Sequence, residues 1–153
     1  MVLRRKRAEV TSKYDSDFYG WANEQATLLR QGRFAESEID NIAEEIESLG
    51  RSEKRELVNR VAVLLTHLLK WRFQPGLRGN SWRLTIAEQR HEITDHLEDN
   101  PSLRPSLDQA IMRAYKKAVL AARKETGFAE NTFPAMCPYT IAQVFDSDFF
   151  PDT

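Results

Sequence analysis

The chain has 153 residues, 41% of them hydrophobic and 29% charged, with a formal net charge of −1. This length and composition are ordinary for a soluble globular protein with a substantial core. No apolar run approaches the roughly 20 residues that a membrane-spanning helix needs. The basic start lacks a following apolar stretch, so it does not predict a secretory signal, and the single Cys137 excludes an internal disulfide. We therefore expect a bacterial-type cytoplasmic protein.

The pattern of apolar residues predicts helices along most of the chain. Residues 1–13 are polar, basic and aperiodic, which indicates a flexible arm before a single helical-bundle domain over residues 14–153. Apolar residues then recur at helical spacing in two segments of the first half of this domain. A first helix is expected to start near Ser16 or Asp17 and to end before Gly32, and a second to run from about Ser37 to Leu49.

The most apolar segment predicts a central helix from about Glu53 to Phe73. Gly50 lies between this helix and the one before it, and its position has two interpretations. It either ends the earlier helix or is tolerated inside one long helix, at a cost of about 1 kcal/mol relative to Ala. We expect a break or a kink.

The second half of the chain predicts two more helices and an irregular tail. One helix is expected to start at Asn80 or Ser81 and to stop at the Asn-Pro of residues 100–101, and another to run from Ser102 to Gly127. Residues 128–153 are rich in Phe and Pro and predict a strap, in which Thr140 and Gln143 form a capping box for one short helix. The predicted fold is therefore all-α, a bundle of about five helices with this aromatic, Pro-rich C-terminal strap.

Charge is segregated along the chain although the net charge is small. Residues 15–50 contain nine acidic residues and two arginines, whereas residues 51–90 contain nine basic residues and three glutamates. Adjacent antiparallel helices of opposite charge would explain this pattern, either within one chain or between subunits. The alternative is that the basic middle binds an anion or, together with the basic arm, nucleic acid. We favour the first interpretation and regard nucleic-acid binding as a weak second alternative.

A set of polar and aromatic residues lies on or beside the apolar stripes of three predicted helices. Polar side chains in such positions require partners. Either they satisfy one another and fix the register of the helices, or they line a small-ligand or hydrolytic site with a carboxylate and a histidine as base and acid and an arginine as anion holder. The candidate residues are Glu45, His67, Trp71, Trp82, Gln89 and Arg90.

Other chemistry finds little support in the sequence. Bundle metal sites use a repeated Glu-x-x-His pair, which is absent, and His67 has no second histidine well placed beside it. Cys137 has no basic neighbour that would make it a thiolate. We expect neither a metal nor another cofactor.

The predicted helix over residues 102–126 carries a second apolar stripe. Met112, Tyr115 and Val119 form it, and a second stripe indicates either burial on two sides or a subunit contact. The favoured hypothesis is therefore a protein-binding or self-associating module without catalysis, with these residues in the contact.

Several short motifs together resemble one bacterial family. The chain resembles the domain-of-unknown-function family number twenty-nine (DUF twenty-nine) from Tyr14 to Pro151. This resemblance implies an all-helical fold, and it brings no established activity and no assigned catalytic residues. The motifs are Tyr14–Trp21, Ile42–Gly50, His67–Trp71, Ser81–Arg83, Gln89–Arg90, Thr132–Pro134 and Cys137–Tyr139.

Overall fold

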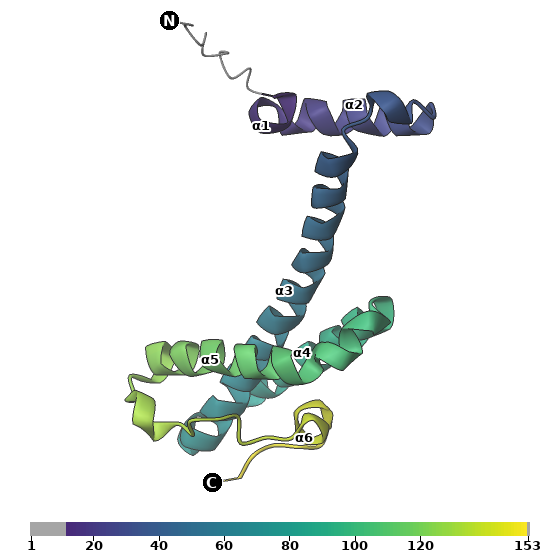
Figure 1. The fold of residues 1–153 in the computed structure, drawn as a ribbon. Helices are drawn as coiled ribbons and strands as arrows, with labels where there is room; N and C mark the ends of the chain where they lie inside the picture. The colour runs from purple at the N-terminus through teal and green to yellow at the C-terminus, as the bar shows by residue number, and fades with distance from the viewer. Residues whose placement is uncertain (1–11, 153) are drawn as a thin grey trace, which may run out of the picture. The chain divides into compact units, whose positions relative to one another are not determined.

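The computed structural model describes residues 12–152, and within that range the protein contains helices and no strands. The all-α prediction is thereby confirmed. No helix in the described range is long and apolar enough to cross a bilayer. The α-helices, shown in Figure 1, are α1 (Lys13–Ser16), α2 (Phe18–Arg30), α3 (Ile39–Phe73), α4 (Asn80–Asp99), α5 (Leu107–Thr126) and α6 (Ile141–Phe145).

Helix α2 begins and ends where the sequence indicates. The Asp17 carboxylate accepts a hydrogen bond from the backbone N–H of Gly20 at 3.0 Å, which caps the helix. After Arg30 the chain turns at Gly32, whose φ of +69° is a left-handed conformation that favours glycine. The prediction for this element is confirmed.

Helix α3 corrects the prediction of a break at Gly50, and a kink there stays a prediction. The helices expected over 37–49 and 53–73 form one helix of 35 residues from Ile39 to Phe73, and Gly50 lies inside it. A Cβ at Gly50 would meet no atom within 4 Å, so no close approach requires glycine there. The helix continues because Gly costs only about 1 kcal/mol and the strong helix formers on both sides offset it.

Helix α5 begins later than the sequence indicated. Residues Pro101–Ser106 form a 3₁₀ segment, and the α-helix runs from Leu107 to Thr126. The ring of Pro105 disfavours the α conformation of the residue before it, Arg104, so the α-helix starts only after the proline. The helix ends at Gly127, whose φ is +75°.

The chain divides into two compact units, and the boundary falls between Gly50 and Arg51. In the first unit, Trp21 and Gln25 of α2 are buried. Both side chains donate to the Glu38 carboxylate, at 2.8 Å from Trp21 Nε1 and 3.0 Å from Gln25 Nε2. The backbone N–H of Glu38 donates to Gln25 Oε1 at 2.8 Å, which fixes the chain immediately before α3. The prediction of one domain over residues 14–153 stays a prediction, and residues 1–11 of the expected arm lie outside the described residues.

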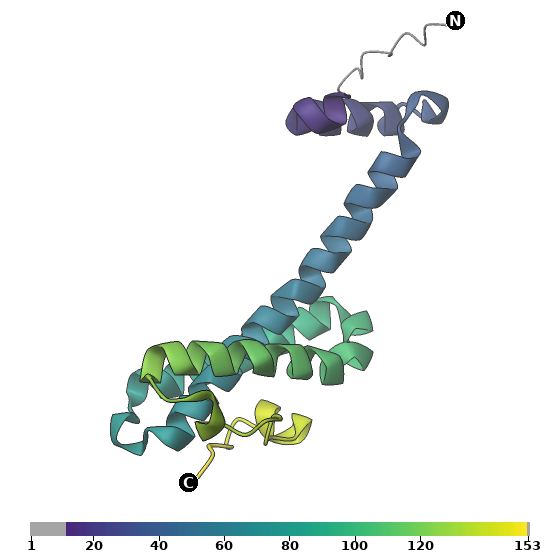
Figure 2. The same ribbon diagram turned by 60° about the vertical axis from the view of Figure 1, so that its left-hand side comes forward.

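The second unit contains the main hydrophobic core. Apolar residues from the second half of α3, from α4 and α5 and from the C-terminal segment pack together, and Figures 1 and 2 both show α5 running across this part of α3. Its fully buried large side chains are Leu57, Val61, Leu64, Leu65, Leu68, Leu69, Ile86, Ile93 and Val144.

The C-terminal segment follows the predicted strap. Phe133, Tyr139 and Val144 are buried against the core, and α6 begins with the expected capping box. The Thr140 hydroxyl accepts from the backbone N–H of Gln143 at 3.2 Å, and Gln143 Oε1 accepts from the backbone N–H of Thr140 at 3.0 Å. The strap therefore belongs to the core of the second unit.

Candidate functional site

A shallow apolar groove runs between α5 and the strap. It consists of two hollows of about 770 and 600 Å³, and both are lined by Tyr115, Lys116 and Ala135. Met112 and Leu120 on α5 and Met136 on the strap are 62%, 62% and 75% exposed. The α5 stripe predicted from the sequence thus forms one wall of a groove.

Tyr115 lies beneath this surface. Only 4% of Tyr115 is exposed, and its hydroxyl donates to the carbonyl oxygen of Pro134 at 2.6 Å. This bond holds the strap against α5, and burial raises the pKa of Tyr115 to about 12. Tyr115 forms the floor of the groove, and Met112, Leu120 and Met136 form its exposed edges. Leu120 and Met136 were not expected in this surface, because their place in the groove depends on how the strap packs against α5.

Arg90 holds the end of the strap. Its Nε donates to the carbonyl of Val144 and its Nη2 to that of Phe149, each at 2.8 Å, and longer bonds of 3.4 Å reach the carbonyls of Gln143 and Ser147. Burial lowers the pKa of Arg90, and the charge of Asp146 acts in the opposite direction. The donors of this guanidinium are directed to backbone carbonyls.

The other candidates of the second unit, His67, Gln89 and Trp82, have separate surroundings. His67 Nδ1 lies 2.8 Å from the carbonyl oxygen of Val63, one turn earlier in the same helix. Gln89 Oε1 is buried and has no hydrogen-bond partner among residues 12–152. Trp82 is partly buried and has the Lys70 ammonium 4.7 Å above its ring.

Trp71 and Arg90 come together through the strap. The rings of Trp71 and Phe150 lie 4.8 Å apart, and the Arg90 guanidinium lies 5.7 Å from the Phe150 ring. Phe150 contacts both Trp71 and Arg90. The sequence alone did not indicate this, because Phe150 lies 60 residues after Arg90. Trp71 is buried in the core of the second unit, and it also lines a small surface pocket.

Glu45 belongs to the first unit. Its carboxylate accepts a hydrogen bond from the Tyr14 hydroxyl, and this bond raises the pKa of Tyr14 to about 12. Tyr14 also packs its ring against Trp21 at 4.6 Å. Glu45 is therefore part of the contacts between α1 and α3.

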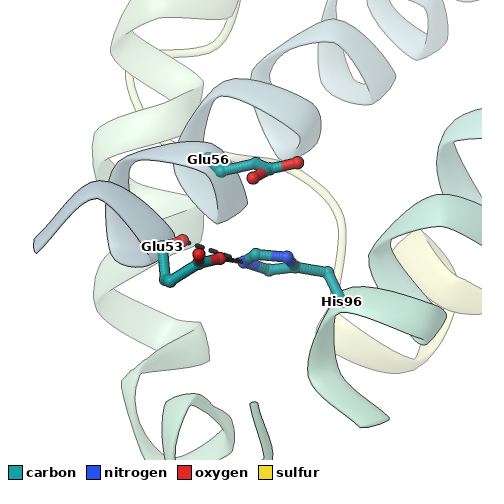
Figure 3. Close-up of side chains that lie close together, drawn as sticks. All are labelled: Glu53, Glu56 and His96. Atoms are coloured by element: carbon teal, nitrogen blue, oxygen red, sulfur yellow. Dashed lines mark hydrogen bonds and ion pairs between the residues drawn. The ribbon is translucent and has the colours of Figure 1, made fainter. Parts of the chain in front are cut away.

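Glu53, Glu56 and His96 form a further cluster, shown in Figure 3. One ligand atom from each of these residues lies within 4.8 Å of the others, as a metal site would require. However, His96 Nε2 lies 2.9 Å from the backbone carbonyl of Glu53. A carbonyl oxygen only accepts, so Nε2 carries the proton and cannot be the ligand atom, which leaves Nδ1 as the nitrogen with a lone pair. Glu56 is also paired with Arg60, at 2.9 Å. The arrangement therefore ties α4 to α3 through a buried histidine.

These features define an all-α protein with a surface groove and a buried arginine that holds the C-terminal strap. The chain matches the domain of unknown function DUF29 over residues 13–150, and it belongs to this family. The resemblance noted from the sequence motifs is confirmed. Comparisons with curated proteins and with solved structures give no match.

Proposed function

We propose that this DUF29 protein is a self-associating, protein-binding module whose docking surface is the groove between α5 and the strap. The observation that carries this proposal is the exposure of Met112, Leu120 and Met136 along one groove. Contiguous exposed apolar surface is typical of protein interaction sites. We place the module in the bacterial cytoplasm, which its single cysteine supports.

The charge of the groove indicates the kind of partner. Lys116 lies between Met112 and Leu120, four residues from each, and therefore on the same face of α5. Asp108 lines one hollow and Glu130 the other, and Glu130 is paired with Arg123 at 3.7 Å. Lys116 is the charged residue common to both hollows. An acidic amphipathic helix would complement the apolar residues of the groove and Lys116.

The first half of α3 is such a helix. Ile39, Ile46 and Leu49 are 53%, 63% and 68% exposed and share one face. Acidic residues, including Asp40 and Glu44, accompany this apolar stripe, and residues 38–50 contain no basic residue. The spacing from Ile39 to Ile46 is two helical turns, close to the spacing from Met112 to Leu120. We infer that residues 39–49 of a second copy occupy the groove.

The oligomeric state of the full chain tests this proposal. Sedimentation velocity over a concentration series is expected to show association for the natural chain. A Met112→Glu/Leu120→Glu variant and an Ile46→Glu variant should both remain monomeric, because a carboxylate cannot be buried in an apolar contact without a partner. Leu84→Glu is the matched control, since Leu84 is 61% exposed on α4 outside the groove.

A charge exchange tests the identity of the occupant. Lys116→Glu should weaken association by about tenfold, and mixing this variant with Asp40→Lys should restore part of it. Monomeric natural protein at all concentrations would overturn the proposal. If the Met112→Glu/Leu120→Glu variant is monomeric but the Ile46→Glu variant still associates, the assignment of residues 39–49 as the occupant of the groove is overturned.

A further inference from the structure

A second, smaller pocket lies between the end of α3 and the start of α4. It has a volume of about 290 Å³ and is lined by Trp71, Arg78, Gly79, Asn80 and Arg83. It shares no lining residue with the groove between α5 and the strap. We propose that this pocket binds the phosphate group of a small molecule, a function beyond the proposed self-association.

The Arg78 guanidinium is anchored at Nε, and the N–H groups of its buried Nη2 are unused within residues 12–152. Its Nε donates to the carbonyl oxygen of Trp71 at 2.7 Å, and its guanidinium lies 5.3 Å from the centre of the Trp71 ring. Its Nη2 is buried and has no hydrogen-bond partner among the described residues. A buried N–H group without an acceptor is costly, and more so when it is charged. An anion that binds this guanidinium would supply the missing acceptor if Nη2 turns toward the pocket that Arg78 lines.

Arg83 brings a second positive charge to the same indole. Its guanidinium lies 4.9 Å from the centre of the Trp71 ring and 5.1 Å from that of Phe150. Within residues 12–152, neither Arg78 nor Arg83 has a carboxylate at ion-pair distance, whereas Arg60 has Glu56 at 2.9 Å. Two cations that share one aromatic ring repel each other, and a bound anion would relieve this repulsion.

The start of α4 adds backbone donors to these two arginines. The helix begins at Asn80, and its N-cap residue Gly79 makes no side-chain capping bond. The first backbone bond into the helix runs from the N–H of Arg83 to the carbonyl of Gly79, so the preceding first-turn N–H groups have no acceptor within the helix. The positive end of the helix dipole also favours an anion.

This donor set suits phosphate better than carboxylate. A phosphate monoester carries close to two negative charges and three terminal oxygens, whereas a carboxylate carries one charge and two oxygens. Two guanidinium groups and the N–H groups at Gly79 and Asn80 provide more donors than one carboxylate can accept. The volume leaves room for a small organic substituent on the phosphate.

Calorimetric titration of the full chain with inorganic phosphate tests the inference. Sodium chloride keeps the ionic strength constant, so that general screening does not change. We expect saturable binding that Arg83→Gln weakens by about tenfold or more, the effect of one lost charge-assisted hydrogen bond. Arg78→Gln should have an effect of similar size. Arg104→Gln is the matched control and should bind like the natural chain, because Arg104 is exposed on the 3₁₀ segment outside the pocket.

Arg83 is the decisive position because its side chain is exposed and its removal spares the core. The thermal midpoint of each variant without phosphate verifies that it is folded. Absence of saturable phosphate binding, or equal binding by the natural chain and Arg83→Gln, would overturn the proposal. Acetate binding as tightly as phosphate would overturn the assignment of a phosphate ligand.

Discussion

Arg90 Nη2 donates to the carbonyl oxygen of Phe149 at 2.8 Å and thereby joins α4 to a residue 59 positions later. The same guanidinium donates to Val144 at 2.8 Å. A planar arginine can reach several carbonyls at once, which a lysine cannot do. The end of the strap is therefore held by one buried side chain as well as by its aromatic residues.

Replacing Arg90 with Met should destabilise the second unit. Carbonyls that now accept from the guanidinium would lose their donor while they stay shielded from water, and we expect the free energy of unfolding to fall by about 3 kcal/mol. Urea denaturation followed by circular dichroism measures the change. Arg113→Met, at an exposed position on α5, should change stability by less than about 0.5 kcal/mol. A loss below 1 kcal/mol for Arg90→Met would contradict the role assigned to this residue.

Two buried tyrosines should respond differently to removal of the hydroxyl. Tyr115→Phe loses the bond to Pro134 and leaves that carbonyl without a donor, so we expect a loss of about 1 kcal/mol. The Tyr139 hydroxyl oxygen is buried and makes no hydrogen bond of normal geometry among the described residues, although the nearby Arg72 guanidinium acts to lower its pKa. Tyr139→Phe should therefore be neutral or stabilising. Thermal denaturation of both variants at pH 7 compares them, and a larger loss for Tyr139→Phe would show that its hydroxyl has a partner.

The same tyrosines predict a loss of stability in alkali. Burial raises the pKa of Tyr115 and of Tyr139 to about 12, from 10.0 for an exposed tyrosine. The folded protein holds these protons more tightly than the unfolded chain, so their contribution is complete below pH 10 and is lost between about pH 10 and 12. Denaturation midpoints measured across this range should fall. The denaturation midpoint of Tyr139→Phe should fall less steeply with pH than that of the natural chain. Equal slopes would show that Tyr139 does not contribute to the loss of stability.

Gly50→Ala should stabilise α3. Gly50 lies inside a continuous helix, and a Cβ there meets no atom within 4 Å. Alanine has the higher helix propensity and reduces the freedom of the unfolded chain, so we expect a gain of about 1 kcal/mol. Chemical denaturation measures the gain. A loss of stability would indicate that the helix bends or opens at this glycine in solution.

Zinc should not stabilise the cluster of Glu53, Glu56 and His96. Binding through Nε2 would require His96 to give up its hydrogen bond to the Glu53 carbonyl, and Glu56 would have to leave Arg60 to act as a ligand. We expect the thermal midpoint to be the same with Zn²⁺ and with a chelator. A midpoint raised by Zn²⁺ in the natural chain but not in Glu53→Gln would contradict this expectation.

The candidate site was less predictable than the fold. The sequence identified Trp71 and Arg90 as notable, and the structure links them through Phe150, which no periodicity connects to either. Arg78 was noted only as part of a basic segment, and Arg83 also as part of the family motif Ser81–Arg83. Neither observation indicated a pocket. Residues distant in the sequence meet through packing, and helical spacing does not encode such contacts.

Local interactions explain what the sequence determined by itself. The cap at Asp17, the stop at Gly127 and the box at Thr140 and Gln143 each depend on neighbours within four residues. The continuation of α3 through Gly50 also has a local cause, but the sequence left it open because the cost of glycine is small and the helix formers on both sides offset it. Only the tertiary structure decided which polar groups are paired, since Arg90 found carbonyls of the strap while one guanidinium nitrogen of Arg78 has no acceptor among the described residues.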